Sequence, residues 1–324
     1  MWAVMLAVVV SFVMYVLFFL APGNGLSLAG SFANEAQIAD SSSTQQTTTQ
    51  APLSEYLEFL GHLARADLGT SWRTGDDVTW LLGQAIPASG SLLLGGLVLW
   101  MSIALVVGIR SAVRPRGVVD RVGNAFVLFG LSAHPLWLGL VLAWVFGYLL
   151  GWTPIEGYCD FFRPNAASEC GGPVQWAYHL ILPWIVLSAA YAALYTRMIR
   201  SGVLENLQED YVRAARAKGV SEPNLVRRHA LRNALLPIAT MLTMDLGLAL
   251  SGTIFVEHVF RVPGLGFLTF NAIPRRDLPV LLGVLVFISL VIVLFSLVLD
   301  VILALLDPRI ASPTAPRQAR SVAR

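Results

Sequence analysis

Six stretches of this sequence are long and apolar enough to cross a lipid bilayer, and this pattern leaves few choices of fold. A transmembrane helix needs roughly 20 consecutive apolar residues. The stretches are residues 2–21, 86–109, 122–150, 179–195, 234–256 and 280–306. Charged residues make up 13% of the chain, about half of the roughly 25% that is usual in soluble domains. The sequence therefore predicts an all-α polytopic membrane protein with six transmembrane helices, the third of them kinked at Pro135.

The distribution of basic residues predicts the orientation of these spans. Segments 110–121, 197–232 and 307–324 hold 16 of the 22 Lys and Arg, and the other polar segments hold the remaining 6. Because Lys and Arg are enriched in cytoplasmic loops, we expect both termini in the cytoplasm. No charge precedes Glu35, whereas a secretory signal peptide begins with positive charge. We therefore expect the first span to be retained.

These boundaries predict four regions. They are a first transmembrane helix at 1–21, an external loop at 22–85, a membrane core at 86–310 and a cytoplasmic tail at 311–324. Within the external loop, residues 41–50 are a low-complexity run whose composition favours disorder. Residues 53–66 carry apolar side chains at helical spacing, which indicates a short helix.

The longest polar segment between two apolar ones, residues 210–237, predicts two short helices with a break between them. Residues 211–218 are rich in Ala and Arg, which suits a helix, and Gly219 is a typical stop. Ser221 is a candidate N-cap, and Pro223 lies in the first turn of a second helix that runs to about Asn233.

This segment resembles the cytoplasmic "EAA" loop of permease subunits of bacterial ATP-binding-cassette importers. Ala214, Ala215, Gly219 and Leu236-Pro237 keep the spacing of that motif, while Arg213 stands at its Glu position. The resemblance implies that residues 210–232 form a coupling helix that docks on an ATPase subunit. The residues implied are Arg213, Ala214, Ala215, Arg216, Lys218, Gly219, Arg227 and Arg228. The alternative is a basic, solvated loop without a partner.

The last 110 residues are similar to the dipeptide, oligopeptide and nickel branch of that family. They carry a Glu at 257, a Pro-Gly-Leu-Gly turn at 263–266, an Arg-Asp-Leu-Pro run at 276–279 and a closing Asp-Pro-Arg. The resemblance implies a type I importer permease fold. We expect segment 257–279 to be an external gate that docks a binding protein, or else an ordinary turn that packs the bundle. The gate residues are Glu257, Pro263, Gly264, Gly266 and Asp277, and the two glycines allow positive φ.

Two ionisable residues within the predicted spans are candidates for a translocation path. Asp245 and His134 lie at membrane depth, where ionisable groups are costly and usually face protein or water. Asp245 would line the path and contact a substrate amine. The alternatives are a helix–helix hydrogen bond for Asp245 and simple packing for His134. Asp300 is expected to be a structural acid near the inner end of the last span.

Cys159 and Cys170 are the only cysteines, and both fall in an external segment. A disulfide is permitted there, but the residues alone leave open whether the two thiols are bridged or unpaired. We expect no metal site, because no Cys/His cluster has metal-ligand spacing. The sequence also lacks the Gly-x-x-x-x-Gly-Lys-[Ser/Thr] phosphate loop. The chain is therefore expected to bind no cofactor, and the resemblance places ATP and Mg on partner subunits.

These resemblances imply a transport subunit rather than an enzyme. The chain would form half of a translocation pore for dipeptides or oligopeptides in the bacterial inner membrane. Its implied partners are a second homologous permease, two ATPase subunits, an external substrate-binding protein and the peptide; the net charge of +2 gives no reason to expect nucleic acid. A second hypothesis is an ion-gradient-driven transporter or channel that uses Asp245 and His134. A third, a membrane-bound enzyme, lacks visible catalytic residues.

Overall fold

The structure is a computed structural model that describes residues 12–13, 61–62, 65, 67–162, 170–275 and 277–306. Side chains at 236, 243, 299, 300 and 302–306 are excluded from the description. The predicted first span, the low-complexity run, most of the helix predicted at 53–66, Arg276 and the predicted tail lie outside the described residues, as does the side chain of Asp300.

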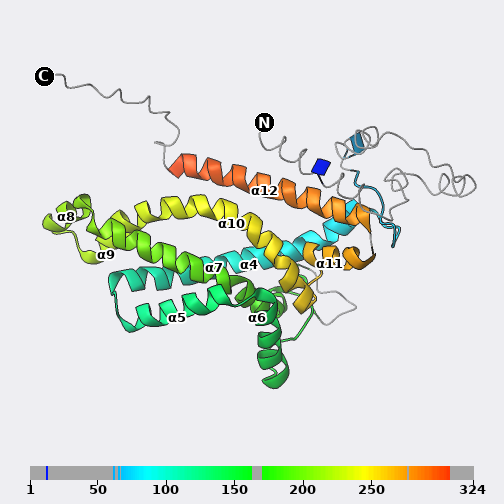
Figure 1. Ribbon diagram of the computed structural model, residues 1–324, viewed down its shortest axis with the longest axis horizontal. Coiled ribbons are helices and arrows are strands. Elements are labelled where there is room, and N and C mark those ends of the chain that lie inside the picture. Colours follow the sequence, from blue (N-terminus) through cyan, green and yellow to red (C-terminus); the bar gives the residue numbers. More distant parts are fainter. Residues whose placement is uncertain are drawn as a thin grey trace, which may run out of the picture.

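Within these residues the fold is an elongated bundle of helices (Figure 1). Its elements are α4 (Val78–Val113), α5 (Val118–Ser132), α6 (Pro135–Leu142), the π-helical turn η2 (Ala143–Leu149), α7 (Pro173–Gln208), α8 (Asp210–Ala217), α9 (Glu222–Asn224), the π-helical turn η3 (Leu225–Ala230), α10 (Leu231–Phe260), α11 (Leu265–Arg275) and α12 (Leu278–Leu306). Helices α4, α7, α10 and α12 contain stretches long and apolar enough to span a membrane. The bent pair α5 and α6–η2 makes a fifth candidate, which agrees with the second to sixth predicted spans.

Helix α4 begins at Val78, eight residues before the predicted start of the second span at residue 86. The Asp77 side chain caps the helix by accepting a hydrogen bond of 2.8 Å from the Thr79 amide. An Asp at this position satisfies one of the backbone donors that a helix N-terminus leaves free. The helix therefore starts before the predicted span, because an apolar run marks membrane depth rather than the start of a helix.

The third predicted span is broken rather than kinked. Helices α5 and α6 meet at an angle of 109°, and α6 points away from the bundle in Figure 1. Pro135 starts α6 at its first turn, and Ala133 and His134 before it have extended backbones. A proline disfavours helical geometry in the preceding residue, which explains why the chain turns here.

Helices α4 and α7 pack closely along their length and form the core. Gly96 of α4 abuts the side chain of Leu187, and Gly108 abuts the backbone of Thr196. Small residues let transmembrane helices approach one another. The α7 side chains also donate to α4 carbonyls: Ser188 Oγ to Gly96 at 3.1 Å, and Trp184 Nε1 to Ser91 at 3.1 Å.

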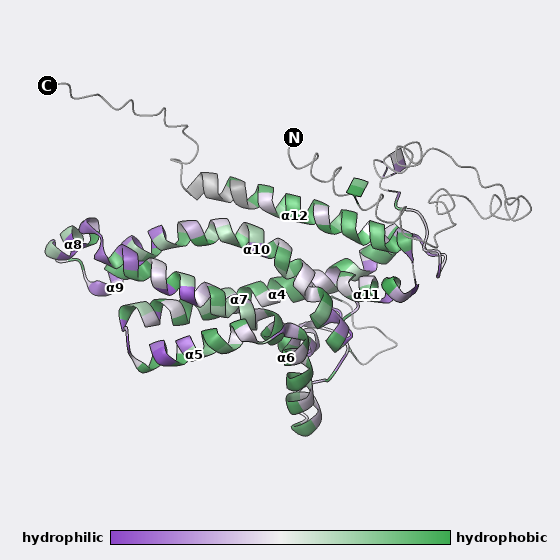
Figure 2. Cartoon of the chain, in the orientation of Figure 1, coloured by the Kyte–Doolittle hydropathy of each residue, from purple (hydrophilic) through white to green (hydrophobic). Residues whose placement is uncertain are grey.

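The two ends of the bundle differ in polarity. Figure 2 shows apolar residues along the long helices and a cluster of polar ones at the end formed by α8 and α9. The turn between α4 and α5, which is rich in Arg, lies at the same end, and α11 lies at the other (Figure 1). The two basic segments predicted to be cytoplasmic therefore share one end of the molecule.

Candidate functional site

Helices α8 and α9 form a folded element at the basic end of the bundle. Three apolar side chains, Val212, Leu225 and Val226, are buried beneath it. Tyr211 ties α8 to both neighbouring long helices: its hydroxyl donates to Asn206 Oδ1 at 2.8 Å and accepts from Asn233 Nδ2 at 3.0 Å. The segment is thus packed onto the ends of α7 and α10.

The predicted break between the two helices is present at Gly219. This residue has φ of +79°, a left-handed conformation that favours glycine. Across the break, Arg216 makes a two-pronged ion pair with Glu222, with Nε–Oε1 at 2.7 Å and Nη2–Oε2 at 3.2 Å. The hydrogen bond from Arg216 lowers the pKa of Glu222, and the same contact raises the pKa of Arg216. Ser221 occupies the N-cap position of α9, but its side chain makes no capping hydrogen bond.

The outer face of this element is open to solvent. Of the residues predicted for coupling, Ala215 is half-buried and the rest are exposed: Arg213, Ala214, Arg216, Lys218, Gly219, Arg227 and Arg228. Arg213 pairs with Asp210 of the same helix at 3.4 Å. Most of the residues predicted for coupling are therefore exposed on this element, and most of the exposed ones are basic.

An ion pair that sequence reasoning missed lies near this end. Asp120 in the first turn of α5 is buried and accepts from Arg200 of α7, at 2.7 Å from Nε and 3.2 Å from Nη2. The backbone amide of Arg116 donates a third hydrogen bond of 2.9 Å. The available signal was that Asp120 is the only acid between Arg110 and Arg121.

At the opposite end, Glu257 is fully buried and holds the start of α11. Its Oε2 accepts from the amides of Gly266 at 2.7 Å and Phe267 at 3.0 Å. Its Oε1 accepts from Ser89 Oγ of α4 at 2.7 Å, and that hydroxyl accepts from the Leu265 amide at 2.7 Å. The carboxylate thus caps α11 from a neighbouring helix and joins three helices at one point.

The two glycines of the 263–266 turn are needed for space and not for positive φ. Neither Gly264 nor Gly266 has positive φ, so that part of the prediction was wrong. A Cβ on Gly264 would collide with the Glu257 and Ser89 side chains, and one on Gly266 would meet the backbone of Ile254. The segment predicted as a loop over 257–279 is also largely helical, since α10 continues to Phe260 and α11 covers Leu265–Arg275.

Asp277 is buried at the junction between α11 and α12. It accepts hydrogen bonds from Ser71 Oγ and, at 3.2 Å, from the amide of Trp72. Arg73 adds a bond of 2.9 Å from Nε to the carbonyl of Arg275. Asp277 therefore fixes the turn before α4 to the start of the last helix.

The two candidate residues of the translocation path lie on different elements. Asp245, half-buried on α10, accepts a hydrogen bond of 2.8 Å from the Tyr195 hydroxyl of α7. His134 caps α6, accepting from the Leu136 amide at 3.2 Å, and its ring packs edge-on against Phe255 of α10. The structure does not bring Asp245 and His134 into contact with each other.

The sequence matches a family over residues 104–312. Its description is "Binding-protein-dependent transport system inner membrane component". This match covers more than half of the chain, including α8, α9 and α11. The chain belongs to this family. It is a polytopic inner-membrane transport component, and the ATPase of such a system is a separate subunit.

Several relatives carry names that refer to peptides. A putative peptide permease protein of Brucella suis is 38% identical over 261 residues, 79% of each chain. The di/tripeptide transport system permease protein DppB of Pseudomonas aeruginosa is 35% identical, over 79% of this chain and 80% of that one. The oligopeptide transport system permease protein AppB of Bacillus subtilis is 36% identical over 79% of each.

The fold is also found in a solved structure. A chain from an inward-facing form of the MetNI methionine ABC transporter aligns with a TM-score of 0.54 and 20% identity. The alignment covers 70% of this chain and 97% of that one. The all-α membrane fold and the importer-permease architecture predicted from the sequence are confirmed.

Proposed function

We propose that this chain forms half of the translocation pore of an ATP-driven peptide importer and is driven through the α8–α9 element. The observation that carries the proposal is the construction of that element. It is anchored by buried Val212 and Leu225 and clamped by the Arg216–Glu222 pair, while Ala214 and its basic neighbours stay exposed. A short helix exposed at the end of the bundle suits a helix-in-groove contact with an ATPase subunit.

Movement of the docked element would be passed directly to the membrane helices. Helix α8 follows α7 after one residue, and α9 and η3 continue without a break into α10. The Tyr211 bonds to Asn206 and Asn233 link all three. ATP-driven closure of the ATPase subunits would therefore tilt α7 and α10 together. The exposed charges at Arg213 and Arg228 would set the orientation of docking more than its affinity.

Peptide cargo is proposed from the names of the relatives and from the motifs in the last 110 residues. On α10, Asp245 lies beside the exposed apolar residues Met241, Met244 and Leu248. A second permease subunit facing this side would place the Asp245 carboxylate between the two halves of the pore. A carboxylate there would attract the amine of a peptide, which is the role we propose for it.

The polarity of the two ends of the bundle suggests where the remaining partners would bind. Two ATPase subunits, which would bind ATP and Mg, belong at the basic end, on the cytoplasmic side with both termini. An external substrate-binding protein belongs at the end formed by α11. Glu257 binds Ser89 of α4, and Asp277, just after α11, binds Ser71 in the turn before α4. A partner that moves α11 would therefore also move the start of α4. This supports segment 257–279 as the external gate.

Purification of the assembled complex from its native host tests the coupling proposal. Ala214→Trp adds bulk to the exposed face of α8, and Val118→Trp adds it to an exposed position of α5 at the same end. We expect the first variant to lose the ATPase subunits while retaining the second permease, and the second variant to retain both. Equal ATPase content in both variants would contradict the docking site.

Uptake of labelled peptide distinguishes this function from an ion-gradient-driven transporter. Uptake is expected to survive an ionophore that collapses the ion gradient and to stop when ATP is depleted. The reverse pattern would favour the gradient-driven alternative, in which Asp245 and His134 act as a relay.

A further inference from the structure

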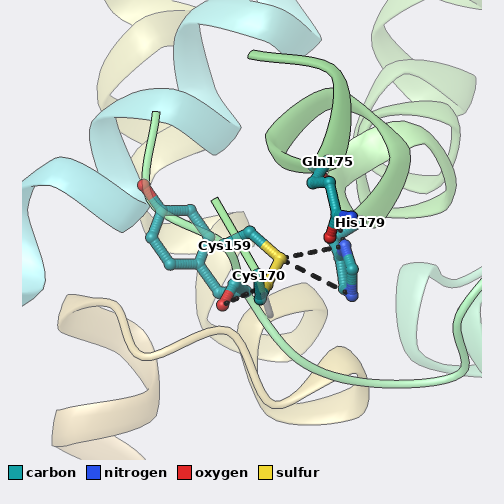
Figure 3. Close-up of a disulfide and its surroundings, with 5 residues drawn as sticks. Cys159, Cys170, Gln175 and His179 are labelled. Atoms are coloured by element: carbon teal, nitrogen blue, oxygen red, sulfur yellow. Dashed lines mark hydrogen bonds between the residues drawn. A yellow bond between two sulfur atoms is a disulfide. The ribbon is translucent and has the colours of Figure 1, made fainter. Parts of the chain in front are cut away.

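A cluster of sulfur and imidazole groups lies outside both the coupling and the gate regions. Cys159 and Cys170, joined by a disulfide with Cα atoms 5.4 Å apart, belong to the connection between η2 and α7. His179, in the second turn of α7, points its ring at Cys159 (Figure 3). The ligand atoms of all three residues lie within 4.8 Å of one another.

The imidazole of His179 is fixed by a contact with the backbone of α7. Its Nδ1 lies 2.9 Å from the carbonyl oxygen of Gln175, one turn earlier in α7. A carbonyl only accepts hydrogen bonds, so this contact places the ring proton on Nδ1 and leaves the lone pair on Nε2. Metal-binding histidines are commonly fixed in this way by a backbone carbonyl on the other ring nitrogen.

The distance from His179 Nε2 to the nearer sulfur is close to the edge of a tetrahedral zinc site. His179 Nε2 lies 3.8 Å from Cys159 Sγ, and Nδ1 lies nearer to the same sulfur, at 3.2 Å. Binding of a metal through Nε2 would therefore require the ring to turn when the disulfide opens. Zinc bonds of about 2.3 Å to sulfur and about 2.05 Å to nitrogen place those two ligand atoms roughly 3.6 Å apart in a tetrahedron. Cys159 is only 1% exposed, while Cys170 and His179 are half-buried, so an ion bound there would be partly shielded from solvent. Two thiolates and one imidazole favour a thiophilic divalent cation over calcium or magnesium.

We propose that Cys159, Cys170 and His179 bind one zinc-type cation when the disulfide is reduced, with water as the fourth ligand. Reduction breaks the S–S bond and adds two electrons and two protons. A phosphine supplies the electrons, and water supplies the protons and the oxygen of the phosphine oxide that forms. Metal binding then releases the two thiol protons. The oxidised pair has no thiolate to offer, so the disulfide and the metal are alternative cross-links of the same loop.

Either cross-link would hold the loop beside the external gate. The amide of Gly157 donates a hydrogen bond of 2.9 Å to the carbonyl of Phe260, the last residue of α10. Arg261, which follows, pairs with Glu156 at 3.1 Å. A loop clamped to α7 therefore also steadies the end of α10, three residues after Glu257.

Metal titration of the full purified chain tests the proposal. The chain is reduced with a phosphine, the phosphine is removed without oxygen, and Co²⁺ is added as a coloured substitute for zinc. We expect one Co²⁺ per reduced chain, with a thiolate-to-cobalt absorption band and tetrahedral visible bands that Zn²⁺ abolishes. The oxidised chain is expected to show neither. A reduced chain without these bands would overturn the proposal.

Two variants test whether His179 binds the metal together with the two cysteines, or whether the two thiols alone bind it. His179→Ala is expected to weaken binding at least about tenfold, a loss comparable to that of a supporting group around a metal. His229→Ala, in the basic segment, is the control and should bind as the parent does. Because Cys159 and Cys170 are the only cysteines, a thiol count on the unreduced His179→Ala chain shows whether its loop still folds and forms the disulfide. Parent-like affinity in a correctly oxidised His179→Ala chain would refute His179 as a ligand.

Discussion

Removal of the Glu257 carboxylate should release the start of α11. In Glu257→Ala, the amides of Gly266 and Phe267 lose their acceptor, and the Ser89 hydroxyl loses the group to which it donates. Each buried polar group left without a partner costs about 1–3 kcal/mol. Water entering the space left by the side chain would offset part of this. We therefore expect a local loss of about 2–5 kcal/mol.

Glu257→Gln should have a smaller effect. The amide oxygen of Gln can still accept from Gly266 and Phe267, and only the Ser89 hydroxyl proton is left without an acceptor. One lost hydrogen bond costs about 1 kcal/mol. The expected order of stability at this junction is therefore parent, then Glu257→Gln, then Glu257→Ala.

Amide hydrogen exchange, read by mass spectrometry on peptides that contain residues 265–267, measures this directly. A loss of about 2 kcal/mol corresponds to roughly 30-fold faster exchange. Glu156→Ala is the control, because it removes an exposed acid at the same end that pairs only with Arg261 among the contacts described. Parent-like protection of these amides in Glu257→Ala would refute the capping role.

Three further predictions concern the basic end and the proposed path. Gly219→Ala forces a side chain into a left-handed conformation and should lower the thermal midpoint of the complex through a strain of about 1–2 kcal/mol; an unchanged midpoint would argue against the observed break. Arg216 lowers the pKa of Glu222 below its ordinary 4.5, so the stability advantage of the parent over Glu222→Gln should be full above pH 4.5 and shrink as pH falls further. Thermal unfolding of the parent and of Glu222→Gln across this pH range checks whether the stability difference shrinks as pH falls. Asp245→Asn can keep the Tyr195 hydrogen bond but loses the charge, so peptide uptake should fall while expression does not; full uptake would remove the charge-based role.

Local signals were sufficient to predict much of the basic end. Gly219, Ser221 and Pro223 mark the boundary between the two short helices, and the structure places the boundary there. Such signals lie within a few residues of the feature that they determine. The second to sixth spans were predicted for a similar reason, because an unbroken apolar run records membrane depth.

The contacts of the proposed gate were only partly predictable, because its hydrogen bonds connect residues that are distant in sequence. Glu257 and Asp277 were singled out, but their partners Ser89 and Ser71 lie 168 and 206 residues away. Nothing in the sequence near a serine indicates such pairing. His179 was missed for another reason: it was counted as the first residue of an apolar span, whereas α7 begins six residues earlier at Pro173.

The length of α7 determines how far a small tilt is amplified. Residues 196–208 continue the helix beyond the predicted span by about 20 Å, at 1.5 Å per residue. A rotation of about 10° around the membrane boundary would therefore displace α8 sideways by roughly 3–4 Å, while residues one turn inside the membrane would move by about 1 Å. With this end on the cytoplasmic side, as we propose, the overhang would act as a lever arm whose long side lies outside the membrane. A displacement of α8 would therefore produce a smaller displacement of the packed helices, with a correspondingly larger force.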